Sequence, residues 1–224
     1  MLPRVILHNA VSVDGRVNGF TPDIGLFYEL AGTWKEDATL AGSATICKPA
    51  EPIPPEDETA FQPPVVEPAD KRPLLVVPDS RGRVRHWHAL RQAGYWRDFI
   101  ALVSRATPPD YLDYLTKRHL KWILTGDERV DLRAALAQLS ARFGVKVIRV
   151  DSGGTLNGVL LRAGLVHEVS VLVHPSLVGG LLPASLFRAS DLTSPEGIIQ
   201  LRLTHVERLR NDLVWLRYDV VREA

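Results

Sequence analysis

The sequence predicts an α/β fold of three layers (αβα), with a mostly parallel central sheet and an antiparallel hairpin at its C-terminal edge. One reason is that short β-branched runs alternate with stretches of helical periodicity, a rhythm that favours parallel strands flanked by helices. Another is a pair of C-terminal strands joined through Asn211 and Asp212, which are typical turn residues. Because 46% of the 224 residues are apolar, the chain can bury the core of a single domain over residues 1–224.

Local patterns predict the elements of the N-terminal half. Residues 5–11 are apolar nearly throughout, as in a strand covered on both faces, and this run ends at the turn Asp14-Gly15. A helix is predicted over residues 24–34 and a short strand over residues 38–41. Proline and acidic residues then dominate the segment of about residues 48–73, which we expect to be an extended surface insertion rather than a packed element.

The same alternation continues through the C-terminal half. Strands are predicted over residues 74–77, 99–103, 122–124, 145–150, 169–173, 198–208 and 213–221. Helices are predicted over residues 110–118, 132–143 and 155–163, and the second is capped by Asp131 and ended by Gly144. In the third helix we expect an apolar stripe to face the core, formed by Leu156, Val159, Leu160 and Ala163.

Charge, cysteine content and hydropathy narrow the class of protein. A formal net charge of +1 indicates no basic surface for nucleic acid, and no uncharged apolar run reaches the roughly 18 residues of a membrane helix. The N-terminal stretch becomes polar too soon for a signal peptide, and a single cysteine, Cys47, suits a reducing compartment, so we expect a cytoplasmic protein. His86 and His88 have no third ligand nearby in the sequence, and no metal site is predicted.

The most informative segment is the strand that runs into Gly153 and Gly154 and then into a helix. Glycines at such a turn let a ligand approach the backbone, where the first N–H groups of the helix and its dipole attract an anion such as a diphosphate. A plain tight turn would explain the two glycines equally well. Their spacing is not the G-x-G-x-x-G fingerprint of the classical dinucleotide fold.

Two other turns that follow strands carry groups suited to phosphate. The turn from Gly42 to Thr45 offers backbone N–H groups and hydroxyls to another part of a diphosphate, or it is a plain capped turn. The turn of residues 80–83 places the Ser80 hydroxyl beside two guanidiniums, Arg81 and Arg83, which suits a phosphate monoester such as the 2′-phosphate that distinguishes NADPH from NADH. The alternative for this turn is a solvated loop.

Three stretches of the chain together resemble one known family. Residues 11–16 read VSVDGR and resemble its S-x-D-G-K/R turn, and residues 37–46 read DATLAGSATI and resemble DAVLVGxGTV. Residues 151–158, 161–168 and 175–180 resemble EGGxTLNG, LLRAGLVDE and PxLVGG, in that order. The chain is therefore identified as a member of the riboflavin-biosynthesis reductase family, meaning the RibD C-terminal domain and its stand-alone relatives, which have a dihydrofolate-reductase-like fold.

The resemblance implies NADPH as the cofactor and a small molecule as the substrate. Asn9 and Ala10 would line the nicotinamide pocket, and Ser80 with Arg81 would lie near the adenosine ribose phosphate. Asp151 stands where the family usually has a substrate-contacting Glu, and Tyr28 would face the substrate. Asp14, beside the nicotinamide, would orient the substrate or relay a proton, unless it is only a turn residue. The residues that would hold the remaining phosphates are Gly42, Thr45, Ser152, Gly153, Gly154, Thr155, Leu156 and Asn157.

The reaction implied by the resemblance is the reduction of a ribosylamino pyrimidinone 5′-phosphate to its ribitylamino form, carried out by a homodimer. The family's D-D/N-P-x-L-T-x-R run, which helps to hold the substrate, is replaced by CKPAEP at residues 47–52. One alternative is therefore a reductase of the same fold that acts on a different carbonyl, imine or pterin-like substrate. Another is a dinucleotide-binding module without turnover.

Overall fold

The computed structural model describes residues 1–48, 52–65, 67, 69–181 and 185–221, and it divides into two compact units. The central unit comprises Met1–Pro3 and Glu36–Ile148, and the terminal unit comprises Arg4–Lys35 and Arg149–Ala224. Strand β6 (Val147–Val150) contains the boundary between them. The single domain expected from the sequence stays a prediction.

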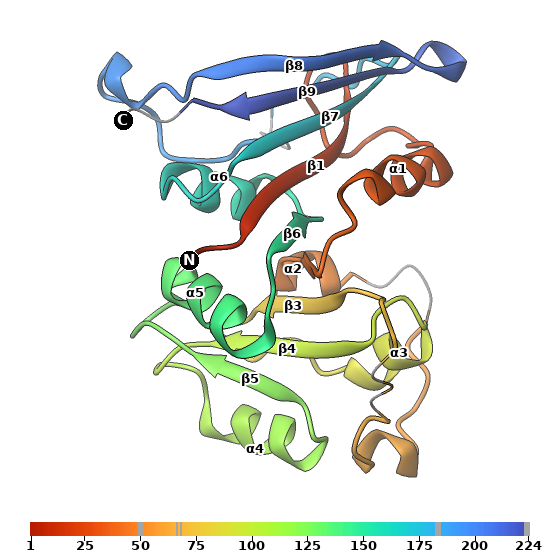
Figure 1. Ribbon diagram of the computed structural model, residues 1–224, viewed down its shortest axis with the longest axis vertical. Coiled ribbons are helices and arrows are strands. Elements are labelled where there is room, and N and C mark those ends of the chain that lie inside the picture. The colour runs from red at the N-terminus through yellow and green to blue at the C-terminus, as the bar shows by residue number, and fades with distance from the viewer. Residues whose placement is uncertain (49–51, 66, 68, 182–184, 222–224) are drawn as a thin grey trace. The chain divides into compact units, whose positions relative to one another are not determined.

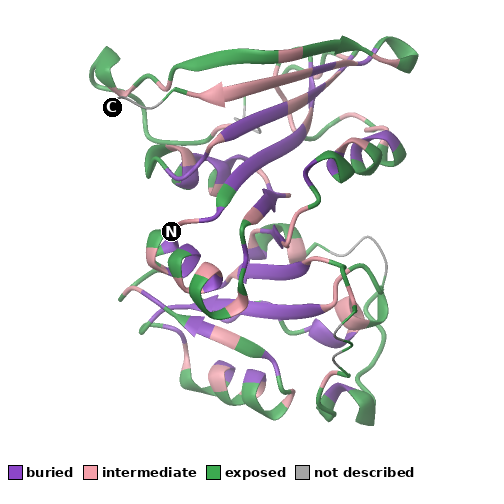
Figure 2. Ribbon diagram, viewed as in Figure 1, coloured by how far each residue is buried: buried purple, intermediate pink, exposed green. Residues whose placement is uncertain are grey.

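The central unit contains four parallel strands in the spatial order β5-β4-β3-β2 (Figure 1). Their bounds are β2 Ala38–Leu40, β3 Leu74–Pro78, β4 Asp98–Val103 and β5 Lys121–Leu124. The four predicted strands are confirmed, each within a residue of its expected ends. Residues of both parities along β3 and β4 are buried, so both faces of this part of the sheet are covered (Figure 2).

Helices α2 (Ser43–Ile46), α3 (Trp87–Gln92), α4 (Pro109–Lys117) and α5 (Leu132–Phe143) complete this unit. One buried cluster joins alternate residues of β3 and β4 to Trp87 of α3 and to Tyr111 and Leu115 of α4. Helix α5 is capped as predicted, because Asp131 accepts a hydrogen bond from the backbone N–H of Ala134 and Gly144 adopts a φ of 67°. Helix α3 has no clear sequence periodicity and was not predicted.

The described part of the proline-rich insertion is exposed over most of its length, as expected of a surface insertion, but one short segment packs on the rest of the central unit. Glu58–Phe61 forms a 3₁₀ helix in which Ala60 is buried. The carboxylate of Glu56 accepts two hydrogen bonds from the Arg118 guanidinium, at 2.8 and 2.5 Å, and this guanidinium lies 4.7 Å from the centre of the Phe61 ring. Residues 49–51, 66 and 68 of the insertion lie outside the described residues.

The terminal unit contains β1 (Arg4–Ser12) and β7 (Glu168–His174), which are parallel, followed by β9 (Val214–Val220) and β8 (Leu201–Arg208), which are antiparallel. The predicted C-terminal hairpin is confirmed, and both Asn211 and Asp212 adopt positive φ in its turn. With parallel strands in both units and antiparallel strands only at the C-terminal end, the predicted α/β class is confirmed.

Helices α1 (Ile24–Ala31) and α6 (Gly154–Arg162) belong to the terminal unit, with 3₁₀ turns at Gly32–Trp34, Pro195–Gly197 and Arg210–Asp212. The helix predicted over residues 24–34 is confirmed, although its last three residues tighten into a 3₁₀ turn. No helix among the described residues is both long enough and apolar enough to cross a membrane.

Strand β1 carries a buried histidine, His8, at the centre of a one-way chain of hydrogen bonds. The indole N–H of Trp215 donates to the Ser170 hydroxyl at 2.8 Å, and this hydroxyl lies 2.9 Å from His8 Nδ1. His8 Nε2 lies 3.0 Å from the carbonyl oxygen of Phe27, so Nε2 carries the proton and Nδ1 accepts. Burial, with smaller contributions from Arg149 and Arg217, lowers the pKa of His8 to about 4.

We expect His8 to make stability depend on pH in a defined window. The pKa of His8 in the folded protein lies below the ordinary value of 6.5, so between these two pKa values the unfolded chain binds a proton at this histidine that the folded protein does not. The contribution of neutral His8 to the free energy of unfolding is therefore fully present above pH 6.5 and is lost as the pH falls toward 4. From pH 7 to pH 5 the loss attributable to His8 is about 2 kcal/mol. Urea unfolding at both pH values should show this slope, and His8→Gln should remove it. An equal slope in the variant would contradict the assignment.

Candidate functional site

The turn at Gly153, predicted from the sequence to bind a ligand, lies at the start of α6 and has open space beside it. Gly153 is the N-cap residue, with φ of −83° and ψ of 175°, a conformation that any residue adopts. A Cβ built on Gly153 would meet no heavy atom of the described residues within 4 Å. Neither backbone strain nor packing therefore requires a glycine here. The first N–H groups of an α-helix have no partner within the helix, so they are available to a bound anion.

Gly154 has a packing role that the sequence did not reveal. A Cβ at Gly154 would overlap the carbonyl oxygen of Ser185 and lie 3.2 Å from the backbone nitrogen of Arg188. At Gly158, one turn later, a Cβ would overlap the carbonyl oxygen of Arg188. The Arg188 N–H also donates to the carbonyl oxygen of Gly154 at 3.0 Å. These two glycines therefore seat the segment of residues 185–189 directly on the α6 backbone.

The predicted apolar stripe of α6 is confirmed at Leu160, which is buried, and at Leu156, which is half-buried, but it is wrong at Val159 and Ala163. Val159 is 49% exposed, and Ala163 is exposed as well. The buried residues of the helix are Gly154, Asn157, Gly158 and Leu160. The pattern of large apolar residues misled because the buried face is formed largely by small and amide residues, which a neighbouring backbone covers.

Asn9 and Asn157 form a buried amide pair next to the Gly153 turn. Asn9 Nδ2 donates to the carbonyl oxygen of Ser152 at 2.7 Å, and Asn157 Nδ2 donates to Asn9 Oδ1 at 2.9 Å and to the carbonyl oxygen of Leu186 at 3.0 Å. The pair ties the end of β1 to the residue before the turn, while Ala10 lies opposite Leu172 of β7. Thr155 is exposed and Leu156 is half-buried on the first turn of the helix.

Tyr28 and Asp151, both predicted to contact the substrate, lie within hydrogen-bond distance of each other. The Tyr28 hydroxyl lies 3.2 Å from Asp151 Oδ2, and the guanidinium of Arg149 lies 3.2 Å from the same oxygen. The Arg149 side chain is 6% exposed and lies 5.7 Å from the centre of the Tyr28 ring. The sequence analysis did not single out Arg149. Its signal was a lone charged residue inside the apolar run VIRV.

Asp14 holds a loop. Its carboxylate accepts hydrogen bonds from the Ser12 hydroxyl and from the backbone N–H groups of Gly179 and Val178, the last two at 2.7 and 3.1 Å. These hydrogen bonds lower the pKa of Asp14 to about 2. A carboxylate with this pKa carries no proton at neutral pH, so the environment of Asp14 does not suit a proton donor.

The remaining predicted residues lie in the central unit. Gly42 is the N-cap residue of α2, a single helical turn in which Thr45 is exposed, and the Ser43 hydroxyl accepts a hydrogen bond from Arg83 at 2.7 Å. The two histidines weighed as metal ligands serve packing, because His86 Nε2 lies 3.1 Å from the Ile46 carbonyl oxygen and His88 Nε2 lies 2.8 Å from the Pro54 carbonyl oxygen.

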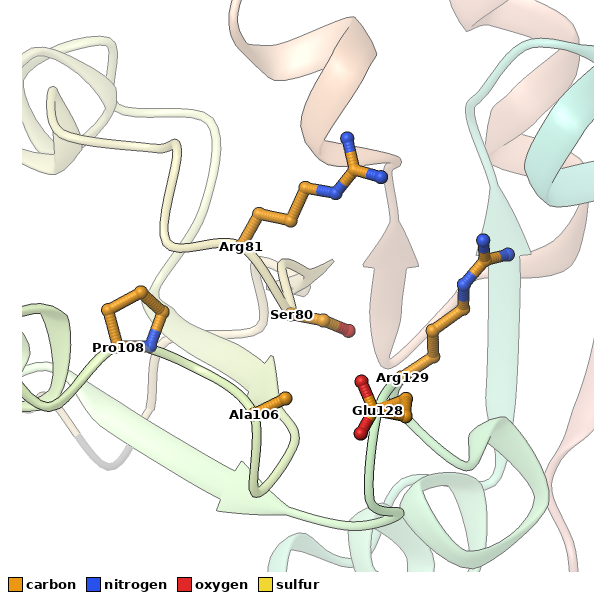
Figure 3. A pocket seen from close by; sticks show the side chains of 6 residues that line it. All are labelled: Ser80, Arg81, Ala106, Pro108, Glu128 and Arg129. Atoms are coloured by element: carbon orange, nitrogen blue, oxygen red, sulfur yellow. The ribbon is translucent and has the colours of Figure 1, made fainter.

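Ser80 and Arg81 line a pocket of about 420 Å³ in the central unit. Its walls come from the loops that follow β3, β4 and β5, and the carboxyl ends of parallel strands are where ligands bind in open α/β sheets. Figure 3 shows Arg81 and Arg129 extending from two different loops, with Ser80 and Glu128 on the same pocket lining. The full lining is Ser80, Arg81, Ala106, Pro108, Glu128 and Arg129. Only Ser80 and Arg81 were predicted, because the other four residues follow β4 and β5 and carry no local signal for this pocket.

Comparison with protein families gives one match over nearly the whole chain, since the model described as the RibD C-terminal domain matches residues 3–215. A curated protein of Methanothermobacter thermautotrophicus is 28% identical, over 96% of this chain and 97% of its own. A second, of Archaeoglobus fulgidus, is 26% identical over 80% of this chain and 84% of its own. Both are named 2,5-diamino-6-ribosylamino-4(3H)-pyrimidinone 5′-phosphate reductase.

Solved structures share the fold. RibD of Acinetobacter baumannii superposes with a TM-score of 0.68 at 18% identity, covering 98% of this chain, which spans 58% of that longer chain. A pyrimidine reductase-like protein of Corynebacterium diphtheriae gives a TM-score of 0.67 at 18% identity, over 99% of this chain and 93% of its own. At these identities the likeness supports the fold alone.

Proposed function

Because the chain belongs to the RibD C-terminal domain family, we propose that it is an NADPH-dependent reductase of riboflavin biosynthesis. Its substrate would be the 2,5-diamino-6-ribosylamino-pyrimidinone 5′-phosphate named for its near full-length relatives. The observation that carries the proposal is the open space over Gly153, a glycine that neither backbone conformation nor packing requires. Room for a ligand at a helix N-terminus explains it.

The residues present fit a dinucleotide in two sets. In the terminal unit, the backbone from Ser152 to Asn157 would hold the diphosphate, and Asn9 with Ala10 would line the nicotinamide. In the central unit, Gly42 and Thr45 would hold a further phosphate oxygen, and Ser80 with Arg81 would hold the phosphate on the adenosine ribose. When bound, NADPH would supply the hydride needed to reduce the carbonyl or imine carbon at C1′ of the opened ribose.

The chain's own part in this reaction is positioning and electrostatics. The pair formed by Asn9 and Asn157 fixes the turn that receives the diphosphate. Tyr28, Asp151 and Arg149 form a polar cluster that would contact the substrate, with the Asp151 carboxylate paired to the arginine. Asp14 would shape the loop of residues 178–179 rather than transfer a proton.

The test is oxidation of NADPH, followed at its near-ultraviolet absorbance, with the diamino-ribosylamino-pyrimidinone phosphate as substrate and NADH as the control cofactor. We expect turnover with NADPH and a ribitylamino product by mass spectrometry. Tight NADPH binding with no turnover of this substrate would move the protein to a reductase of another carbonyl, imine or pterin-like compound. Absence of NADPH binding would contradict both the proposed reaction and this alternative.

A homodimer and a cytoplasmic location complete the proposal. Strand β8 lies at the edge of the terminal unit and leaves Leu203 and Val206 more than half exposed, which supports pairing with a second copy. Sedimentation equilibrium should give twice the chain mass of 24.9 kDa. Charged substitutions at both positions should return the monomer, and a monomeric wild-type protein would contradict this part.

A further inference from the structure

Two arginines in the pocket of the central unit carry guanidinium groups without a partner among the described residues. Arg81 and Arg129 line this pocket from different loops, and neither forms a hydrogen bond or an ion pair there. Two other arginines of the central unit do form ion pairs, since Arg85 pairs with Asp110 at 2.8 Å and Arg105 pairs with Asp127. Two guanidinium groups that share one concave site without an ion-pair partner suit a negatively charged ligand.

The loops that carry these arginines are fastened to each other. The Ser80 hydroxyl accepts a hydrogen bond from the backbone N–H of Val130 at 3.0 Å, and the Thr107 hydroxyl donates to the carbonyl oxygen of Ser80 at 3.0 Å. The residues next to Arg81 and Arg129 are thus held before any ligand arrives. This arrangement lowers the ordering cost of binding a phosphate between the two side chains.

Glu128 adds an opposing charge to the same pocket. Its carboxylate repels a phosphate monoester, yet it is an acceptor of the kind that binds a free ribose hydroxyl in dinucleotide sites. Ser104 fixes the backbone of this residue, since its hydroxyl lies 3.3 Å from the Glu128 carbonyl oxygen. In this pocket the two arginines therefore favour a nucleotide with a 2′-phosphate, and Glu128 favours a nucleotide with a free 2′-hydroxyl.

We propose that Arg129 and Glu128 set the choice between 2′-phosphorylated and unphosphorylated adenine nucleotides in opposite directions. Arg129 completes a two-guanidinium clamp with Arg81 on the 2′-phosphate, and Glu128 weakens that clamp and supports a free 2′-hydroxyl. The inference rests on the proposed function for the identity of the ligand. It goes beyond it by assigning cofactor selectivity to the loop that follows β5.

The experiment is calorimetric titration with adenosine 2′,5′-bisphosphate and with AMP, which carry the adenine ribose with and without the 2′-phosphate. We expect Arg129→Gln to weaken binding of the bisphosphate roughly tenfold or more and that of AMP less than about threefold, as loss of one charge-assisted hydrogen bond implies. Glu128→Gln should tighten the bisphosphate several-fold and should not tighten AMP. Arg105→Gln and Asp127→Asn are the matched controls, because this exposed pair lies outside the pocket lining.

Three outcomes would overturn the inference: an Arg129→Gln protein that behaves like Arg105→Gln, equal loss of both nucleotides in that variant, or no bisphosphate binding by the wild-type protein. None depends on turnover. If selectivity follows Arg129 while NADPH is never oxidised, the proposed reaction fails and the pocket assignment stands. If NADPH is oxidised with the expected substrate but Arg129→Gln is neutral, only the pocket assignment fails.

Discussion

Gly153→Asp is expected to weaken NADPH binding by at least about 100-fold, or about 2.7 kcal/mol, while the fold stays intact. The new carboxylate would stand in the open space over the first turn of α6 and repel the diphosphate proposed to bind there. The fold should tolerate it, because Gly153 has ordinary dihedral angles and aspartate is a better N-cap residue than glycine by a few tenths of a kcal/mol. NADPH titration and thermal unfolding of the same sample measure both effects.

Gly153→Asn is the matched control, since asparagine has the same size and caps a helix equally well but carries no charge. We expect it to retain much more NADPH affinity than the aspartate variant. If both variants bind NADPH as the wild-type protein does, the diphosphate does not lie at this turn. Gly154→Asp would not test the site, because any side chain at residue 154 collides with Ser185 whether or not a cofactor binds.

Gly158→Ala should destabilise the protein by about 1–3 kcal/mol, the usual cost of forcing an extra methyl group into a packed contact. Its Cβ would overlap the carbonyl oxygen of Arg188 and push the segment of residues 185–189 off α6. For a chain of this size the melting temperature should fall by roughly 3–10 °C. Thermal unfolding followed by circular dichroism gives the value.

Gly32→Ala provides the opposite control. Gly32 follows α1 with helical dihedral angles, and a Cβ there would meet no heavy atom of the described residues within 4 Å. Replacing such a glycine reduces the freedom of the unfolded chain, so stability should rise by roughly 0.4–1 kcal/mol. A melting temperature for Gly158→Ala at or above that of the wild-type protein would refute the packing role.

The sequence predicted the strands well because a buried parallel strand is a continuous apolar run, visible without its neighbours. Helix α3 has no comparable signal, since its buried residues, Trp87 and His88, are adjacent in the chain and form no helical stripe. Strand β6 begins two residues later than expected because Asp37 accepts the backbone N–H groups of Lys146 and Val147, a contact over more than a hundred residues. Such long-range contacts leave no local signature.

The residues of the candidate site likewise fall into those with a local sequence signal and those placed by long-range contacts. Residues placed by a local turn, Ser80 and Gly153 among them, were found from the strand-to-loop patterns next to them. Arg129 reaches the pocket through the pairing of β4 with β5, and Arg149 meets Tyr28 through the packing of α1, so neither could be read from its own neighbourhood. Likewise, the acidic and proline-rich composition of the insertion gave no indication that Glu56 forms hydrogen bonds with Arg118.

Because Gly154 and Gly158 of α6 serve packing, the presence of the motif D-S-G-G-T-L-N-G in a related protein does not by itself indicate that this protein is active. Gly154 and Gly158 stabilise the contact with residues 185–189 in any folded copy, including one that has lost its chemistry. Purifying selection on folding alone would preserve them across a gene duplication. Residue 153 is under no such constraint, so a paralogue with aspartate there and both other glycines intact would be recognisable as a folded pseudoenzyme.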